Sequence, residues 1–453
     1  MRDDPIVFRL AHAVAKIDFT ALPIEVVEAA KHLISDCLLV AAAGQSSPLA
    51  NGVRAAITAS VGSCRTWFAS DLPRMGPQEA SFLNAYHAGL LGYGSINAKA
   101  HADAVCLPAA WAVAEQQGRS GAELIWAFVA GSEIVGRLSH HASHRSAGWS
   151  HTSVYGSIGA AVSAGVLLRL TPEQLAHGIA LSIGQAGGTQ QASVESAASR
   201  RLLPAFAARN GVFAAQLAAA GVTGPRFPVE GQFGLRALYE AGDDKLLFQH
   251  LWSDWRLLDT SLKPYPVSAC SQAAIEALLH LQLQHALVEA DILEIVAYVS
   301  PYMFRYVGAE FSLQGDLEML GQFNLRYHLA SALLRGPMAL AHLTSDALMD
   351  AEVARVVGKV HLRVDPRNRS DLAPVTLSVT RRDGSTIEYV QQHPPGSRQQ
   401  PMSATALALK AHQCGLRGGF DGRELLTKVS ELDQIACLGG HAEAMDLFGE
   451  LER

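Results

Sequence analysis

The feature that most constrains the fold is a series of long apolar segments, rich in alanine and glycine, between residues 23 and 225. Their apolar residues recur at helical spacing and continue around most of each segment, so each predicted helix is buried on several sides. Small side chains let such helices approach one another closely. The segments are 23–44, 121–142, 152–170, 171–188 and 204–225. They predict a large helical bundle.

The character of the sequence changes after the Lys-Pro-Tyr-Pro turn at residues 263–266. Three later segments are β-branched or alternating, which is typical of strands. These are 292–304, 358–366 and 374–392, the last with a hairpin turn at Arg382-Asp383-Gly384. Helical segments at 273–284 and 326–336 accompany them.

We interpret residues 267–396 as a smaller α+β lid domain. Residues 392–401 have the composition of a linker, and the tail, 403–453, is helical again. The predicted helical domain is therefore 1–266, completed by 397–453. The predicted fold class is mainly α: a large helical bundle domain plus a smaller α+β lid domain.

Composition excludes several classes of protein. The chain has 453 residues and a net charge of −6, without the basic stripe that a nucleic-acid-binding protein needs. No apolar run reaches the roughly 18–20 residues that span a bilayer, and the N-terminus lacks the apolar core of a signal peptide. The six cysteines have no CxxC spacing, which favours a reduced, cytoplasmic protein without a cysteine-built zinc site.

Lys263 is mounted on a stiff stretch of backbone. Pro264 and Pro266 restrict the turn, and a residue before proline is biased toward extended conformations. A solvated lysine gains nothing from a rigid mount, whereas a reactive lysine does. Lys263 is therefore a candidate catalytic residue.

A polar trio, Ser150, His151 and Thr152, stands where a long predicted helix begins. A helix N-terminus offers free amide donors and a positive dipole end, which suit a carboxylate. Ser150 or Thr152 can also simply cap the helix. His151 is either a catalytic base or an ordinary surface histidine.

Further candidates lie in two other stretches. His87 and His101 flank a predicted loop, and Arg200 and Arg201 form a pair that can grip a carboxylate or simply be solvated. His140 and His144 are four residues apart, but no HExxH pattern exists, so no metal site is predicted. The chain has no P-loop, dinucleotide fingerprint or GxSxG elbow in a suitable context, so no nucleotide cofactor or serine triad is expected.

The order of these motifs resembles the MmgE/PrpD family of 2-methylcitrate dehydratase, cis-aconitate decarboxylase and iminodisuccinate epimerase. The resemblance runs almost end to end. It rests on "HADAVCLPAAWAVAE", "GSEIVGRL", "GWSHTSVYGSIGAA", "LTPEQLAHGIALSIGQAGG", "RRLLPAFAARNGVFAAQLAAAGVTGP" and "KPYP". It implies a helical bundle domain, an α+β lid domain and a cleft between them, in a homodimer. It also implies a small polycarboxylate substrate and no cofactor.

The resemblance assigns residues unevenly. Lys263 matches the family's active-site lysine and His101 the histidine that ends the loop, while Arg200 replaces a second lysine. Relatives carry carboxylates after the first histidine, but His87 is followed by "AGLLGYGS". His151 stands one place after the family's histidine. A histidine expected near Leu203 is missing, and Gln272 replaces another.

The missing loop carboxylate argues against ordinary dehydration, and the remaining bases suit proton transfer beside a carboxylate. The leading hypothesis is an epimerase of an aminopolycarboxylate such as iminodisuccinate, with Lys263 and His151 as the two bases. His101, Arg200, His87, Tyr265 and Ser150 would bind the substrate. Lys263 can alternatively hold a carboxylate while the histidines act as bases. Other hypotheses are a dehydratase or decarboxylase lyase on a citrate-like acid, and a non-catalytic polyanion binder.

Overall fold

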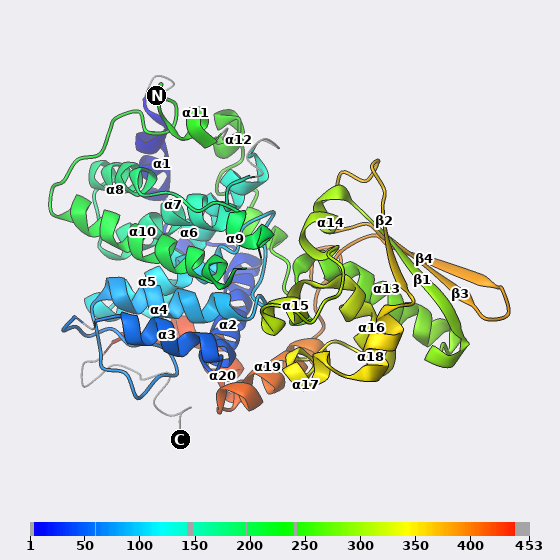
Figure 1. Ribbon diagram of the computed structural model, residues 1–453. Coiled ribbons are helices and arrows are strands. Elements are labelled where there is room, and N and C mark those ends of the chain that lie inside the picture. Colours follow the sequence, from blue (N-terminus) through cyan, green and yellow to red (C-terminus); the bar gives the residue numbers. More distant parts are fainter. Residues whose placement is uncertain (1–3, 59, 143–147, 196, 240–241, 440–453) are drawn as a thin grey trace.

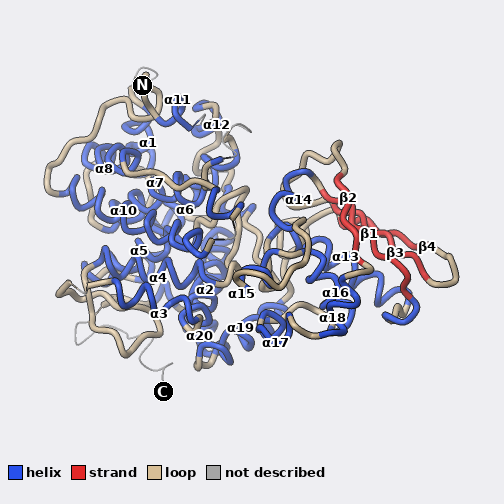
Figure 2. The backbone as a smooth tube through the Cα atoms, in the orientation of Figure 1, coloured by secondary structure: helices blue, strands red, loops and turns tan. Residues whose placement is uncertain are grey.

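The computed structural model describes residues 4–439, apart from 59, 143–147, 196 and 240–241. It has a large helical domain and a smaller domain that carries the sheet (Figures 1 and 2). The predicted fold class, mainly α with an α+β domain, is confirmed. Among the described residues, no helix has both the length and the apolar character needed to cross a membrane.

The helical domain begins with a series of helices up to residue 248. They are α1 (Ile6–Val14), α2 (Ile24–Gln45), α3 (Pro48–Ala56), α4 (Pro77–Leu90), α5 (Asp103–Gln117), α6 (Gly121–His140), α7 (His151–Leu167), α8 (Pro172–Gly184), α9 (Gln191–Val194), α10 (Leu203–Ala219), α11 (Leu235–Tyr239) and α12 (Asp244–Phe248). The caps that the sequence predicts for α8 are present: Thr171 accepts from the backbone N–H of Gln174, and Pro172 occupies the first turn.

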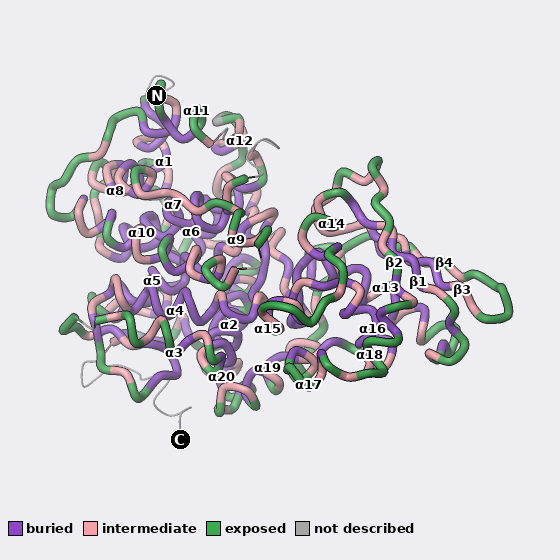
Figure 3. The backbone as a smooth tube through the Cα atoms, in the orientation of Figure 1, coloured by how far each residue is buried: buried purple, intermediate pink, exposed green. Residues whose placement is uncertain are grey.

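Helix α7 is the centre of this domain, in the buried region of Figure 3, and nearly all of its residues are buried. Its neighbours α6 and α10 come close because glycines stand at the crossings. An added Cβ on Gly131 of α6 would lie 2.5 Å from the Gly159 carbonyl oxygen of α7. An added Cβ on Gly211 of α10 would lie 2.4 Å from the Ala160 Cβ of α7. The small residues that the sequence analysis emphasised therefore set the spacing of the bundle.

The α+β domain is built on a four-stranded sheet in the order β2-β1-β3-β4. Strand β1 pairs parallel with β2 and antiparallel with β3, and β3 and β4 form a hairpin. Its elements are α13 (Ala269–His285), β1 (Ile292–Val299), α14 (Pro301–Val307), α15 (Leu317–Phe323), α16 (Leu325–Arg335), α17 (Ser345–Leu348), α18 (Ala351–Val357), β2 (Val360–Val364), β3 (Val375–Arg381) and β4 (Thr386–Gln391). Helix α13 packs against β3 and β4.

One strand is shorter than the sequence predicts. The expected strand at 292–304 ends at Val299, and α14 follows at once. Ser300 caps that helix by accepting from the N–H of Met303, and Pro301 suits its first turn. The hairpin turn at Asp383-Gly384 is confirmed, with Gly384 at a positive φ of 84°.

After the sheet, the chain returns to the helical domain. Helix α19 (Ala404–Gly418) packs against α2 and against α20 (Gly422–Ser430), beneath the junction of the two domains in Figure 1. The last part of the predicted helical tail, 441–453, lies outside the described residues.

We predict that Gly211→Ala lowers the free energy of unfolding by about 1–3 kcal/mol, because the new methyl group meets the backbone of α7. Gly52→Ala in α3 is the matched control, because nothing lies within 4 Å of its added Cβ. Urea denaturation of both variants measures the effect. Equal stability of Gly211→Ala and the parent chain would refute tight packing at this crossing.

Candidate functional site

A small cavity lies between the two domains. Residues from segments 88–104, 150–152 and 190–204 line it together with Lys263 on the side of the helical domain. Residues from 268–270 and α14, with Phe323 and Leu372, line the other side. Its volume is about 150 Å³, which suits a small metabolite rather than a nucleotide.

The Lys263 side chain enters this cavity from a turn that is fixed on both sides. The lysine is 3% exposed, and its Nζ donates to the Gly92 carbonyl oxygen at 2.5 Å. Tyr93 Oη donates to the Pro264 carbonyl oxygen at 2.9 Å. The rigid mount expected from the two prolines is therefore reinforced by hydrogen bonds.

Gln272, in the first turns of α13, holds the other end of the same turn. Its Nε2 lies 2.9 Å from the Tyr265 carbonyl oxygen and 3.1 Å from that of Val267. Its Oε1 accepts from the Tyr265 N–H at 3.3 Å. Gln272 thus ties the start of α13 to the lysine turn.

Burial, and after it the nearby positive charge of Lys410, lower the pKa of Lys263 to about 7. The carboxylates of Asp103 and Asp36 act in the opposite direction. The amine is therefore balanced between its charged and neutral forms near neutral pH, where it can both donate and accept a proton.

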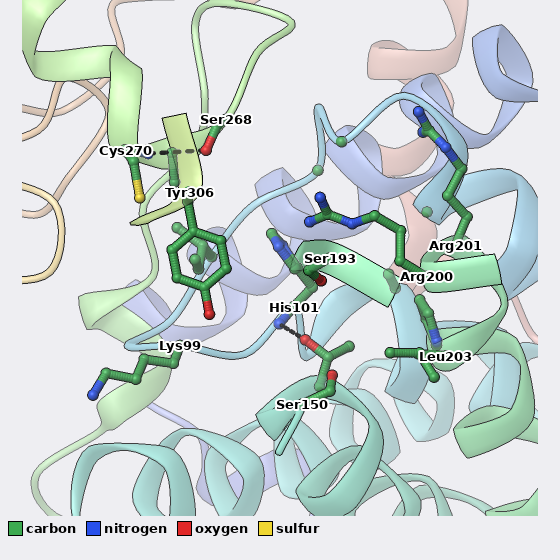
Figure 4. A pocket seen from close by; sticks show the side chains of 18 of the residues that line it. Lys99, His101, Ser150, Ser193, Arg200, Arg201, Leu203, Ser268, Cys270 and Tyr306 are labelled. Carbon is green, nitrogen blue, oxygen red and sulfur yellow. Dashed lines mark hydrogen bonds between the residues drawn. The ribbon is translucent and has the colours of Figure 1, made fainter. Parts of the chain in front are cut away.

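His101 lies in the same cavity and is neutral. Its Nδ1 lies 2.5 Å from the Ser95 carbonyl oxygen, and because a carbonyl only accepts, Nδ1 carries the hydrogen and Nε2 is the basic nitrogen. Burial, with the charge of Lys263, lowers the pKa of His101 to about 3. Its backbone N–H donates to Thr152 Oγ1 at 3.0 Å, which ties the loop to the first turn of α7 (Figure 4).

Positive charge dominates the cavity wall. Arg200, Arg201 and Lys99 line it together with Lys263, and the described lining residues include no carboxylate. The Arg200 guanidinium lies 4.0 Å from the centre of the Phe323 ring. Burial, together with Arg201, lowers the pKa of Arg200 to about 10, so it remains charged at neutral pH.

Arg201 connects the domains. Its Nη2 donates to Gln322 Oε1 at 2.8 Å across the junction. In Figure 4, Cys270 and Tyr306 lie on one side of the cavity, and His101, Arg200 and Ser150 on the other.

Lys99 and the two tyrosines of α14, Tyr302 and Tyr306, line the cavity although the sequence did not predict them as candidates. Lys99 Nζ lies 3.5 Å from Asp371 Oδ2 and 5.5 Å from the centre of the Tyr302 ring. Lys99 stands two residues before His101 in the predicted loop, so its position beside a candidate histidine was the available signal. Tyr302 lies in the stretch 292–304 that the sequence predicts as a strand, and Tyr306 lies just beyond it, so the helix α14 that carries both was not predicted.

The structure does not bring every candidate residue to the Lys263 cavity. Ser150 lines it and also caps α7 by accepting from the Ser153 N–H, so capping does not remove this residue from the cavity wall. His151 lines a second, adjoining cavity with Lys99, Arg305 and Arg369. Its Nδ1 lies 3.0 Å from Ser139 Oγ, and burial lowers its pKa to about 4.

His87 and Tyr265 are not among the described residues that line either cavity. His87 Nε2 lies 3.5 Å from Arg54 Nε, and burial lowers its pKa to about 3. Tyr265 Oη donates to Glu276 Oε2 at 2.7 Å. His144 lies outside the described residues, and among those described no cluster of three potential ligands could hold a metal ion.

Two family models match the chain. The MmgE/PrpD N-terminal domain matches residues 8–246, and the MmgE/PrpD C-terminal domain matches residues 265–426. Lys263 falls just before the second matched range.

Curated relatives are similar over most of the chain. A cis-aconitate decarboxylase-like protein of Aspergillus oryzae is 27% identical over 417 residues, which cover 85% of this chain and 86% of the relative. The cis-aconitate decarboxylase of Homo sapiens is 25% identical, covering 77% and 74%. That of Mus musculus is 26% identical, covering 90% and 87%.

The protein is thus of a two-domain class, in which a helical domain and an α+β domain enclose a cavity lined by positive charge. The chain belongs to the MmgE/PrpD family.

We predict that Arg200→Gln weakens binding of citrate, used as a tricarboxylate probe, by about tenfold or more, because a buried charged donor is lost. Isothermal titration calorimetry measures the affinity. Arg226→Gln removes an exposed arginine outside the cavity and should leave the affinity unchanged. Unaltered citrate binding by Arg200→Gln would contradict an anion-binding role.

Proposed function

We propose that this protein is a lyase that acts on a small polycarboxylate of the cis-aconitate or citrate type. The observation that carries this is the gathering of Lys99, Lys263, Arg200 and Arg201 around one small cavity. Lys99 pairs with Asp371, but the described residues that line the cavity include no carboxylate. This excess of positive charge favours an anionic ligand, because the ligand supplies negative charge. The similarity to cis-aconitate decarboxylases supports the same substrate class.

The residues of the cavity suit decarboxylation of an unsaturated acid. In that reaction a C–C bond breaks and CO2 leaves. The electron pair of that bond forms a new double bond, and the pair of the former double bond moves to a carbon atom that takes up a proton. Lys263 is the proposed proton donor, because its pKa of about 7 keeps a protonated fraction available. Arg200 and Lys99 would hold the carboxylates that remain.

The comparisons favour this lyase over the epimerase that was the leading hypothesis from sequence. Epimerisation with Lys263 and His151 needs both bases at opposite faces of one carbon atom. His151 lines the adjoining cavity, whereas Lys263 lines the cavity described above. An epimerase would therefore have to reach across both cavities. The homodimer and the cytoplasmic location stay predictions.

Proton NMR in deuterium oxide tests the reaction. We expect cis-aconitate to give new alkene signals with deuterium incorporated from solvent or, failing that, 2-methylcitrate to give new alkene signals by loss of water, and we expect no turnover by Lys263→Met. Lys16→Met, which removes an exposed lysine, is the control for lost charge. Exchange and inversion of iminodisuccinate alone would establish the epimerase instead. Binding without turnover of any of the three acids would establish a polyanion binder.

The rate should depend on pH through Lys263. The protonated donor is present below its pKa of about 7 and is lost above it, so kcat/KM should fall as the pH rises through 7. Lys263→Arg keeps the charge but gives up its proton too rarely, so kcat should drop by about 100-fold or more. A rate that instead rises through pH 7 would make Lys263 a base and refute the donor role.

A further inference from the structure

Lys410 lies directly behind the lysine of the cavity. Helix α19 carries it back into the helical domain, where its side chain is fully buried. Its Nζ lies 2.5 Å from Asp36 Oδ1 on α2. The same nitrogen donates to the carbonyl oxygens of Tyr93 and Lys263, each at 3.0 Å. It also lies 3.9 Å from the centre of the Tyr93 ring.

Stability alone is a poor explanation for this arrangement. Removing two charges from water costs several kcal/mol for each ion, and apolar residues of similar size often serve a fold equally well. Here the pair occupies the wall behind the one turn that carries Lys263. A role connected with that turn accounts for the location.

The contacts fix both ends of Lys263 to the same short segment. Lys410 holds the Lys263 carbonyl beside that of Tyr93, while Lys263 Nζ donates to Gly92. The backbone of Lys263 is therefore held by Lys410. The Lys263 amine is held by the Gly92 carbonyl, in the residue next to Tyr93, which Lys410 also contacts. Such support is what a precisely placed reacting group requires.

The fixed charge of Lys410 also opposes protonation of Lys263. Other titratable groups lie near the same amine: the carboxylates of Asp103 on α5 and Asp36 on α2 favour its protonated form, while Cys270 on α13 and His101 are neutral neighbours. Of the charged groups, Lys410 has the largest influence on the pKa of Lys263, ahead of both carboxylates. Asp36 keeps Lys410 paired, so the positive charge persists in a buried place.

We propose that Lys410 is a positioning residue for Lys263: it fixes the backbone of that residue and places a second buried amine behind the lysine turn. The inference rests on the proposed function only in taking Lys263 as the residue that meets the substrate. Lys410 itself is behind the turn and is not among the described residues that line the cavity.

The test measures the proton affinity of Lys263 directly, without a substrate. Competitive labelling with trace acetic anhydride between pH 5 and 10, followed by peptide mass spectrometry, gives the midpoint for each lysine. Lys410→Met should strengthen proton binding at Lys263 by about tenfold or more, because a like charge is removed. Lys410→Arg retains the charge and should leave the midpoint near that of the parent protein.

Two further variants separate positioning from folding. Asp36→Asn with Lys410→Met leaves no unpaired buried charge, and should still raise the midpoint, but by less, because an attractive carboxylate is lost as well. Lys31→Met removes a different buried lysine, which lies on α2 and pairs with Asp433. This variant should leave the labelling midpoint of Lys263 unchanged. Circular dichroism confirms which variants are folded.

The outcomes decide the proposal. An unchanged Lys263 midpoint in folded Lys410→Met or in the double variant overturns it, and so does loss of folding in both, which would make the pair purely structural. If the midpoint shifts as expected, the proposal stands even where no polycarboxylate is turned over, since the labelling does not involve substrate. If the lyase reaction is found but the midpoint does not move, only the role of Lys410 is refuted.

Discussion

The close packing of α7 against α6 and α10 is the constraint on which the site depends. Glycines at the crossings remove the side chains that would hold these helices apart, so α7 is buried along nearly its whole length. Its first turn is therefore fixed at the junction of the domains, where Ser150 and Thr152 line the cavity. The loop that carries His101 is attached to this turn by a backbone hydrogen bond to Thr152. The close packing of the core thus fixes the positions of the side chains that line the cavity.

The electrostatics of the site follow from burial. Lys263, Arg200 and His101 are each shifted toward their neutral forms, first by loss of water and then by neighbouring positive charge. An anionic ligand reverses part of that effect, because it supplies opposite charge in a region of low dielectric. Binding and proton transfer are therefore coupled in this cavity: the ligand that the cations attract also strengthens the hold of Lys263 on its proton.

The cavity exists only because two domains meet. Arg201 reaches from the helical domain to Gln322, and Lys99 pairs with Asp371, so ionic and polar contacts join the two walls. The chain crosses the junction twice, at the lysine turn and again before α19, and Lys410 connects the second crossing to the first. Any relative movement of the domains would change the distance between the cations and the α14 tyrosines, and with it the shape offered to a ligand.

The sequence by itself determined the long helices of the bundle and the hairpin, because hydrophobic periodicity and capping residues act locally, but it did not show where β1 ends and α14 begins. It also identified Lys263, His101, Arg200 and Ser150, which the structure brings to one cavity. Only the tertiary structure decided the direction of neighbouring side chains. Ser150, the N-cap of α7, and Thr152 line the Lys263 cavity, whereas His151 between them lines the adjoining one. Lys410, 147 residues from Lys263, carries no local signal at all, since its significance arises from a contact that only the folded chain creates.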